Sequence, residues 1–227
     1  MKGPYIREWF SIITYALRIA WELITTMRSM RRVRMPAITI FGSSSIDQKN
    51  KYAQQAFTFA QKVVAHDISV LTGGGPGIME AANCGAMQKK EQQKDMVSSL
   101  GIGVTYVDTQ YENPCVPVIR VSYFFLRKWL LIRYAMAFVI FPGGVGTVDE
   151  LFELLNCMKH HKVPKLPVIL IGVDYWKPLI DWLQARAYAQ GFVSAYQINL
   201  ITVTDDLDEA FATIRDVCEQ YHQYIKK

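Results

Sequence analysis

Residues 137–153 read AFVIFPGGVGTVDELFE, and they carry the strongest pattern in the chain. The segment begins with five apolar residues in a row, which is typical of a parallel strand covered on both faces. The run ends at Pro142, three glycines follow, and an amphipathic helix pattern resumes at Leu151. A glycine turn between a strand and a helix favours anion binding, because free backbone N–H groups and the helix dipole both attract negative charge.

The same segment also permits a purely structural interpretation. Thr147 and Glu150 have the spacing of a capping box, in which Thr147 caps the helix and Glu150 reaches back toward it. Such a cap contributes about 1 kcal/mol, but it leaves the glycines unexplained. Gly143, Gly144 and Gly146 would let the backbone approach a phosphate without a Cβ in the way. The sequence therefore favours an anion site.

A second glycine-rich loop, residues 73–77, contains four glycines in five positions, more than a tight turn requires. It does not match GxGxxG, because Ile78 takes the last glycine position, and it lacks the Gly-Lys-Ser/Thr of a P-loop. Ser43 and Ser44 follow another apolar run, Ala37–Phe41. Ligands of open α/β sheets bind outside the carboxyl ends of the strands. We therefore expect the three loops to converge on one site.

These motifs resemble those of the LOG family, the cytokinin-activating nucleotide phosphoribohydrolases and their bacterial relatives, often labelled lysine decarboxylases. The signature PGGxGTxxE is matched by residues 142–150, and the Arg-Lys pair that precedes it by Arg127 and Lys128. The run GGGPGIMEAAN, residues 73–83, is similar to the second signature in its bacterial form. Plant-type members carry Met-His-Glu before the Arg-Lys pair, whereas this chain has Phe-Phe-Leu at residues 124–126, which places it nearer the bacterial branch.

The resemblance implies hydrolysis of the N-glycosidic bond of a nucleoside 5′-monophosphate, which releases a free base and ribose 5-phosphate. Breaking that bond develops positive charge on the sugar. Glu150 is the candidate to stabilise this charge and to accept a proton from the attacking water. Arg127 stays protonated, so its expected role is to hold phosphate or to orient Glu150 and the sugar. The residues expected to bind substrate are Gly143, Gly144, Gly146, Thr147, Gly74, Gly75, Gly77, Glu80, Ser43, Ser44 and Lys128, with Asn83 facing the site beside Glu80.

Three other functional classes remain open. A nucleotide-binding regulatory protein without catalysis would carry the same loops. An interaction protein would act through its N-terminal helix. A lysine decarboxylase needs a lysine that binds pyridoxal phosphate, and Lys128 is the only lysine beside the expected site.

The basic excess of the chain is confined to its N-terminal arm. Residues 1–35 hold seven basic and two acidic side chains and therefore carry the whole net charge of +5. The remaining 18 basic and 18 acidic residues cancel (25 less 7 and 20 less 2). A neutral body argues against a nucleic-acid partner. The four cysteines, at positions 84, 115, 157 and 218, show no metal-ligand or disulfide pattern, so we expect free thiols in a reducing cytoplasm, without metal or cofactor.

Residues 1–35 are expected to form a separate amphipathic basic helix. Its polar stripe consists of Arg7, Ser11, Thr14, Arg18, Glu22 and Thr25. Arg18 and Glu22 interrupt the roughly twenty apolar residues that a transmembrane span needs, and no small-residue cleavage site of a signal peptide follows. The helix either packs on the body or a partner subunit, or lies on a membrane surface.

Residues 36–227 are expected to form a Rossmann-like nucleotide-binding catalytic domain that assembles as a homodimer. Apolar runs alternate with helical patterns throughout this part of the chain. The strands are expected at residues 37–41, 68–71, 100–107, 117–121, 137–141, 167–173 and 200–203, with helices between them, including 50–65 and 174–190. This alternation predicts an α/β fold, a doubly wound parallel sheet with helices on both faces.

Overall fold

The computed structural model describes residues 3–87, 96–105 and 111–225. The chain divides into two compact units, residues 1–32 and 33–227. The first unit contains one helix, α1 (Gly3–Met30), as the sequence predicts. Most of its large apolar side chains are exposed, with Trp9, Leu17 and Trp21 each more than 60% accessible. Within the described part of the chain, no helix combines the length and apolarity required to span a bilayer.

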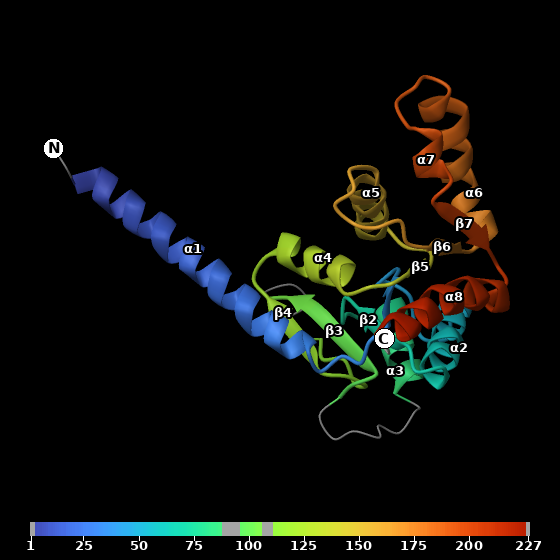
Figure 1. Ribbon diagram of the computed structural model, residues 1–227, viewed down its shortest axis with the longest axis horizontal. Helices are drawn as coiled ribbons and strands as arrows, with labels where there is room; N and C mark the ends of the chain where they lie inside the picture. Colours follow the sequence, from blue (N-terminus) through green and yellow to red (C-terminus); the bar gives the residue numbers. More distant parts are fainter. Residues whose placement is uncertain (1–2, 88–95, 106–110, 226–227) are drawn as a thin grey trace. The chain divides into compact units, whose positions relative to one another are not determined.

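The second unit is built on seven described strands that are all parallel, in the order β4-β3-β2-β1-β5-β6-β7 (Figure 1). The strands are β1 (Ala37–Phe41), β2 (Ser69–Thr72), β3 (Ser99–Val104), β4 (Val118–Val121), β5 (Phe138–Ile140), β6 (Val168–Ile171) and β7 (Ile201–Thr204). Their residues are mostly apolar and buried on both faces, as expected of a parallel sheet between two helical layers. The predicted Rossmann-like fold is confirmed.

Eight further helical segments connect or follow these strands. They are α2 (Lys51–Ala65), α3 (Ile78–Ala86), α4 (Phe124–Arg133), α5 (Val145–Lys159), α6 (Val173–Trp182), the π-helical turn η1 (Leu183–Tyr188), α7 (Ala195–Ile198) and α8 (Leu207–Ile225). Figure 1 shows α2, α3 and α8 grouped on one side of the sheet, with α4 and α5 on the other. Alternation along β1 matches this arrangement: Ile38 and Ile40 belong to the core with α2, whereas the Thr39 hydroxyl donates to the carbonyl oxygen of Leu131 in α4.

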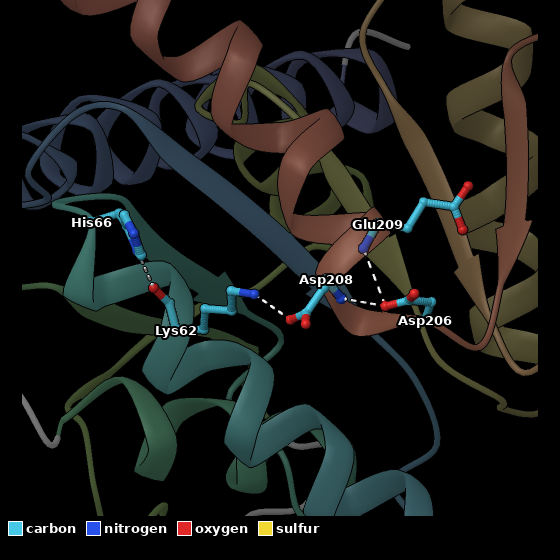
Figure 2. Close-up of polar contacts among 5 residues, drawn as sticks. All are labelled: Lys62, His66, Asp206, Asp208 and Glu209. Carbon is cyan, nitrogen blue, oxygen red and sulfur yellow. Dashed lines mark hydrogen bonds and ion pairs between the residues drawn. The ribbon is translucent and has the colours of Figure 1, made fainter.

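The start of α8 is fixed against α2 (Figure 2). Asp206 Oδ1 accepts hydrogen bonds from the backbone N–H groups of Asp208 and Glu209, at 2.7 and 3.2 Å, and so caps the helix. Lys62 of α2 forms an ion pair with Asp208, and the adjacent His66 Nδ1 lies 2.9 Å from the Lys62 carbonyl oxygen. With its start fixed in this way, α8 covers the same face of the sheet as α2.

The direction of winding reverses between β1 and β5. From β1 the chain proceeds through α2 to β2 and onward to β4, and it then crosses back through α4 to β5 on the other side of β1. A reversal of this kind opens a crevice at the carboxyl ends of the two strands. The loops that follow β1 and β5, which begin at Gly42 and Phe141, lie at this reversal.

Several local expectations differ from the structure. The N-cap of α5 is Gly144, three residues before Thr147, so the predicted capping box is wrong. In α2, Phe59 and Val63 are buried and Phe57 is half-buried. The helix expected over 174–190 is α6 followed by η1, and α7 begins at a capping box of Ser194 and Gln197 that we did not predict.

Candidate active site

A cleft of about 340 Å³ opens at the carboxyl ends of the strands β1 to β4, beside the N-terminus of α5. The residues of its lining that the sequence predicts are Ser43, Ser44, Gly74, Gly75, Arg127, Gly144, Gly146, Thr147 and Glu150. Four other predicted residues, Gly77, Glu80, Lys128 and Gly143, do not belong to this lining. The three loops expected to converge therefore do meet at one cleft.

Backbone hydrogen bonds through Ser43 join the three loops. Its N–H group donates to the carbonyl oxygen of Pro142 in the loop after β5, at 3.0 Å. Its carbonyl oxygen accepts from the N–H group of Ile78, the first residue of α3, also at 3.0 Å. The Ser43 hydroxyl accepts from the N–H group of Ser45 at 3.1 Å. Ser43 thus holds the cleft together as well as lining it.

The glycines of the two loops serve different purposes. Gly77 has φ +69°, and a Cβ there would collide with the carbonyl oxygen of Ser43. A Cβ on Gly143 would collide with the Thr147 hydroxyl. A Cβ on Gly144 or Gly146, in contrast, would meet no heavy atom within 4 Å. Close packing within the protein therefore explains Gly77 and Gly143, whereas Gly144 and Gly146 face open space in the cleft, next to the N-terminus of α5.

This difference predicts opposite effects for two glycine substitutions. Gly144→Val should leave the melting temperature nearly unchanged, because Gly144 has φ −81° and space for a side chain. It should nevertheless block an anion from the first N–H groups of α5. Gly77→Ala should lower the free energy of unfolding by roughly 1–3 kcal/mol, because the backbone there is left-handed and crowded. Thermal unfolding of both variants checks this, and a strongly destabilised Gly144→Val would contradict it.

Arg127 of α4 and Glu150 of α5 face each other in the cleft. Arg127 Nη1 lies 3.5 Å from Glu150 Oε1, and Arg127 Nε donates to the carbonyl oxygen of Ile102 at 3.0 Å. A Cβ on Gly73 would collide with the Arg127 guanidinium, so this glycine makes room for the arginine. Glu150 is only 8% exposed. The arginine is therefore held in place by a backbone carbonyl and directed at a buried carboxyl group.

The environment of Glu150 favours its protonated form. Burial raises the pKa of Glu150 to about 7, although the positive charges of Arg127 and Lys128 act in the opposite direction. A carboxyl group with this pKa can take up and release a proton near neutral pH, as general acid–base chemistry requires. Because Gly144 caps α5, the location of Glu150 is not explained by helix capping.

The raised pKa of Glu150 predicts a pH-dependent loss of stability. The folded protein holds this proton up to about pH 7, whereas the unfolded chain releases it near 4.5. The stabilisation is therefore complete below pH 4.5 and is lost as the pH rises to 7, by about 3 kcal/mol in total. Urea unfolding between pH 4.5 and 8 should show this loss in the wild type relative to Glu150→Gln. Parallel stability curves for the two proteins would refute the raised pKa.

Lys128 is engaged by two acidic residues outside the cleft. Its Nζ lies 2.5 Å from Asp149 Oδ2 and 2.7 Å from Glu153 Oε2. Burial lowers the pKa of Lys128, but its hydrogen bonds to the two carboxylates more than offset this, so the pKa is raised. Lys128 is therefore held in an ion-pair network, and its contact with a substrate stays a prediction. A Schiff-base lysine requires a neutral amine, so this environment is unsuited to decarboxylase chemistry.

The family model described as "Possible lysine decarboxylase" matches residues 79–214, which include both Arg127 and the loop of Gly144. The chain belongs to this family, the LOG family. It is 24% identical over 193 residues to the cytokinin riboside 5′-monophosphate phosphoribohydrolase of Rhodococcoides fascians, covering 84% of this chain and 95% of the relative. It is 30% identical over 176 residues to the pyrimidine/purine nucleotide 5′-monophosphate nucleosidase of Escherichia coli K12, covering 73% of this chain and 38% of the longer relative.

Solved structures share the fold of this LOG-family chain at low sequence identity. The molybdenum cofactor carrier protein of Chlamydomonas reinhardtii superposes with a TM-score of 0.57 at 20% identity, covering 80% of this chain and 98% of that protein. The molybdenum cofactor binding protein of Rippkaea orientalis gives a TM-score of 0.58, also at 20% identity, covering 81% and 98%. At this level of identity the similarity establishes the fold alone.

One wall of the LOG-family cleft is formed by the segment that begins at Tyr111. The Tyr111 hydroxyl donates to Glu80 of α3, and Asn113 Nδ2 donates to Asn83 Oδ1 at 3.1 Å. Cys115 forms a disulfide with Cys84 of α3. Three contacts along one side of α3 thus hold this segment in place. Burial is the main cause that raises the pKa of Tyr111, and the hydrogen bond to Glu80 raises it further, so the phenol stays neutral.

The contacts in this wall show that two of the expectations from the sequence are wrong. Asn83 does not face the site, because it is fully buried and its amide is hydrogen-bonded to Thr72 and Ser99, at 2.7 and 2.8 Å. The expectation of four free thiols is wrong for Cys84 and Cys115, although Cys157 and Cys218 are free. The two cysteines are 31 residues apart in the sequence, and this spacing does not indicate a disulfide. The pairing arises because the chain returns to α3 after β3.

The disulfide predicts a measurable response to reduction. Opening a covalent loop of 31 residues should lower the free energy of unfolding by up to about 4 kcal/mol. Thermal unfolding of the oxidised protein with and without dithiothreitol measures this effect. The double variant Cys84→Ser/Cys115→Ser should not respond to the reductant. Alkylation of four thiols in the denatured, unreduced protein would contradict the disulfide.

The lining of the cleft also contains residues that were not predicted from the sequence, among them Met79, Tyr111, Arg120 and Phe124. Arg120, at the end of β4, donates through Nη2 to the carbonyl oxygen of Tyr111 at 2.9 Å. A single arginine in a short extended segment carries no motif, so only the position of β4 at the edge of the sheet reveals it.

Proposed function

We propose that this protein hydrolyses the N-glycosidic bond of a nucleoside 5′-monophosphate and releases a free base and ribose 5-phosphate. The observation that carries the proposal is the buried carboxyl group of Glu150, paired with Arg127 in the same cleft as the N-terminus of α5. The names of the relatives, a phosphoribohydrolase and a nucleosidase of nucleotide 5′-monophosphates, support hydrolytic chemistry of this general kind.

The phosphate group of the substrate is assigned to the N-terminus of α5. The N–H groups of Val145, Gly146 and Thr147 lie in the first turn, where the helix offers them no acceptor. Gly144 and Gly146 leave the approach to these groups free. The helix dipole adds partial positive charge at the same place. A phosphate bound there would fix one end of the nucleotide.

Glu150 is assigned as the general base and as the group that stabilises positive charge on the sugar. Its ionised form accepts a proton from water as the oxygen attacks the anomeric carbon, and the bond to the base breaks with the electron pair leaving on the base. Arg127 is assigned to positioning Glu150 and favouring its ionised form through their ion pair. A pKa near 7 allows Glu150 to alternate between both forms.

A screen of the common nucleoside 5′-monophosphates with purified protein tests this function. Chromatography should show a free base appearing in at least one reaction, in amounts that grow with time and enzyme concentration. A nucleotide-binding regulatory protein, which could use the same loops, would retain a monophosphate without converting it. Tight binding without product for every nucleotide would therefore favour the regulator and overturn the enzyme.

A further inference from the structure

The helix α1 presents a long apolar stripe that its own unit leaves uncovered. Trp9, Ile13, Leu17, Ile24 and Met27 recur at intervals of three, four or seven residues, so they share one side of the helix. All five are exposed, from 39% for Met27 to 65% for Trp9. A continuous apolar surface of this length indicates a binding surface in an otherwise folded protein.

The opposite side of α1 is polar, and several of its hydroxyl groups form hydrogen bonds within the helix. The hydroxyl of Thr14 donates to the carbonyl oxygen of Ser11 at 2.9 Å, and that of Ser29 donates to Thr25 at 3.2 Å. Thr25 itself bonds the carbonyl oxygen of Trp21 at 3.0 Å. Ser and Thr within a helix commonly bond back to the backbone in this way. The helix thus has one apolar and one polar side, as a helix lying at a boundary between water and an apolar phase requires.

Positive charge accompanies the apolar stripe. The arm of residues 1–35 carries the entire net charge of the chain, +5, and Arg28, Arg31 and Arg32 are clustered and exposed where α1 ends. Arg34, in contrast, is paired with Asp67 at 2.9 Å. An anionic surface would complement this cluster, whereas a second copy of the same helix would bring the same positive charge and repel it.

We propose that α1 binds the surface of a membrane containing anionic phospholipids. It lies in the plane of the interface, with Trp9, Leu17 and Ile24 toward the acyl chains and the arginine cluster at the phosphate groups. It does not cross the bilayer in this proposal, because α1, although 28 residues long, is not apolar enough to span it. This role is independent of the proposed hydrolase activity, because it uses none of the residues that line the cleft.

Co-sedimentation of the full chain with lipid vesicles tests the proposal. The protein should sediment with phosphatidylcholine vesicles that contain phosphatidylserine, and at least tenfold more weakly with phosphatidylcholine alone. Leu17→Asp should weaken binding to the anionic vesicles at least tenfold. Thr14→Asp places the same carboxylate on the polar side of the same helix and should weaken it no more than about threefold. Circular dichroism and the activity of both variants should match the wild type.

The arginine cluster has its own test. Arg31→Gln/Arg32→Gln should weaken binding to anionic vesicles by about thirtyfold, the combined effect expected of two surface arginines. Three outcomes would overturn the proposal: no sedimentation with anionic vesicles, equal sedimentation with both kinds of vesicle, or equal effects of Leu17→Asp and Thr14→Asp. If sedimentation velocity shows instead that Leu17→Asp dissociates an oligomer while vesicles are not bound, α1 is a subunit contact.

Discussion

Glu150→Gln should lower turnover of a nucleoside 5′-monophosphate by at least about a hundredfold, the scale of general-base effects. Glutamine keeps the shape of the side chain and can still accept a hydrogen bond from Arg127, which lies 3.5 Å away. It can neither accept a proton from water nor supply negative charge beside the sugar. Initial rates at saturating substrate measure the effect, and the affinity for the nucleotide should change much less.

A matched control is available on the same helix. Glu153→Gln removes a carboxylate one turn away, which pairs with Lys128 at 2.7 Å and does not line the cleft. Its turnover should stay within about threefold of the wild type. Equal losses in the two variants would mean that the effect of Glu150→Gln is not specific to the carboxyl group in the cleft. Near-normal turnover of Glu150→Gln would remove Glu150 from the mechanism.

The second large effect concerns the 5′-phosphate of the substrate. Adenosine or guanosine should be cleaved at least about a hundredfold more slowly than the corresponding monophosphate. The N-terminus of α5 binds the phosphate in our account, and binding energy from this remote group positions the glycosidic bond for attack. Loss of the phosphate should therefore lower turnover as well as affinity. Rates for each pair of nucleoside and nucleotide provide the comparison.

Gly144→Val connects this effect to the glycine loop. The side chain fits the protein without a clash, so it should interfere only with an occupant of the cleft. Cleavage of the monophosphate should fall toward that of the nucleoside, while cleavage of the nucleoside changes little. Equal rates for nucleoside and nucleotide in the wild type would show that the glycine loop is only a turn.

The positions of the strands and loops along the chain could be predicted from the sequence, because runs of apolar residues mark the strands and glycines mark the loops that follow them. The run before Pro142 and the run before Gly42 both became buried parallel strands, and their loops meet through Ser43. The start of α5 could not be fixed in the same way. Glycine and threonine both occur at N-cap positions, and the cap of α5 is Gly144, not Thr147.

The site was less predictable where it depends on contacts between distant segments. The pairing of Lys128 with Asp149 and Glu153 requires α4 and α5 to be adjacent, and no local pattern indicates this. The disulfide of Cys84 and Cys115 likewise depends on a segment that returns to α3. Local motifs thus identified Arg127 and Glu150, while the opposite wall of the cleft required the structure.

The most direct test of the central claim is the stoichiometry of the products formed from one nucleoside 5′-monophosphate. Proton and phosphorus NMR of a single reaction with the wild-type protein would follow base, sugar and phosphate together. We predict that free base and ribose 5-phosphate appear in equal amounts, at the rate at which the nucleotide disappears, with the phosphate still attached to the sugar. Release of inorganic phosphate and an intact nucleoside, or persistence of the nucleotide in a bound and unconverted form, would contradict the claim.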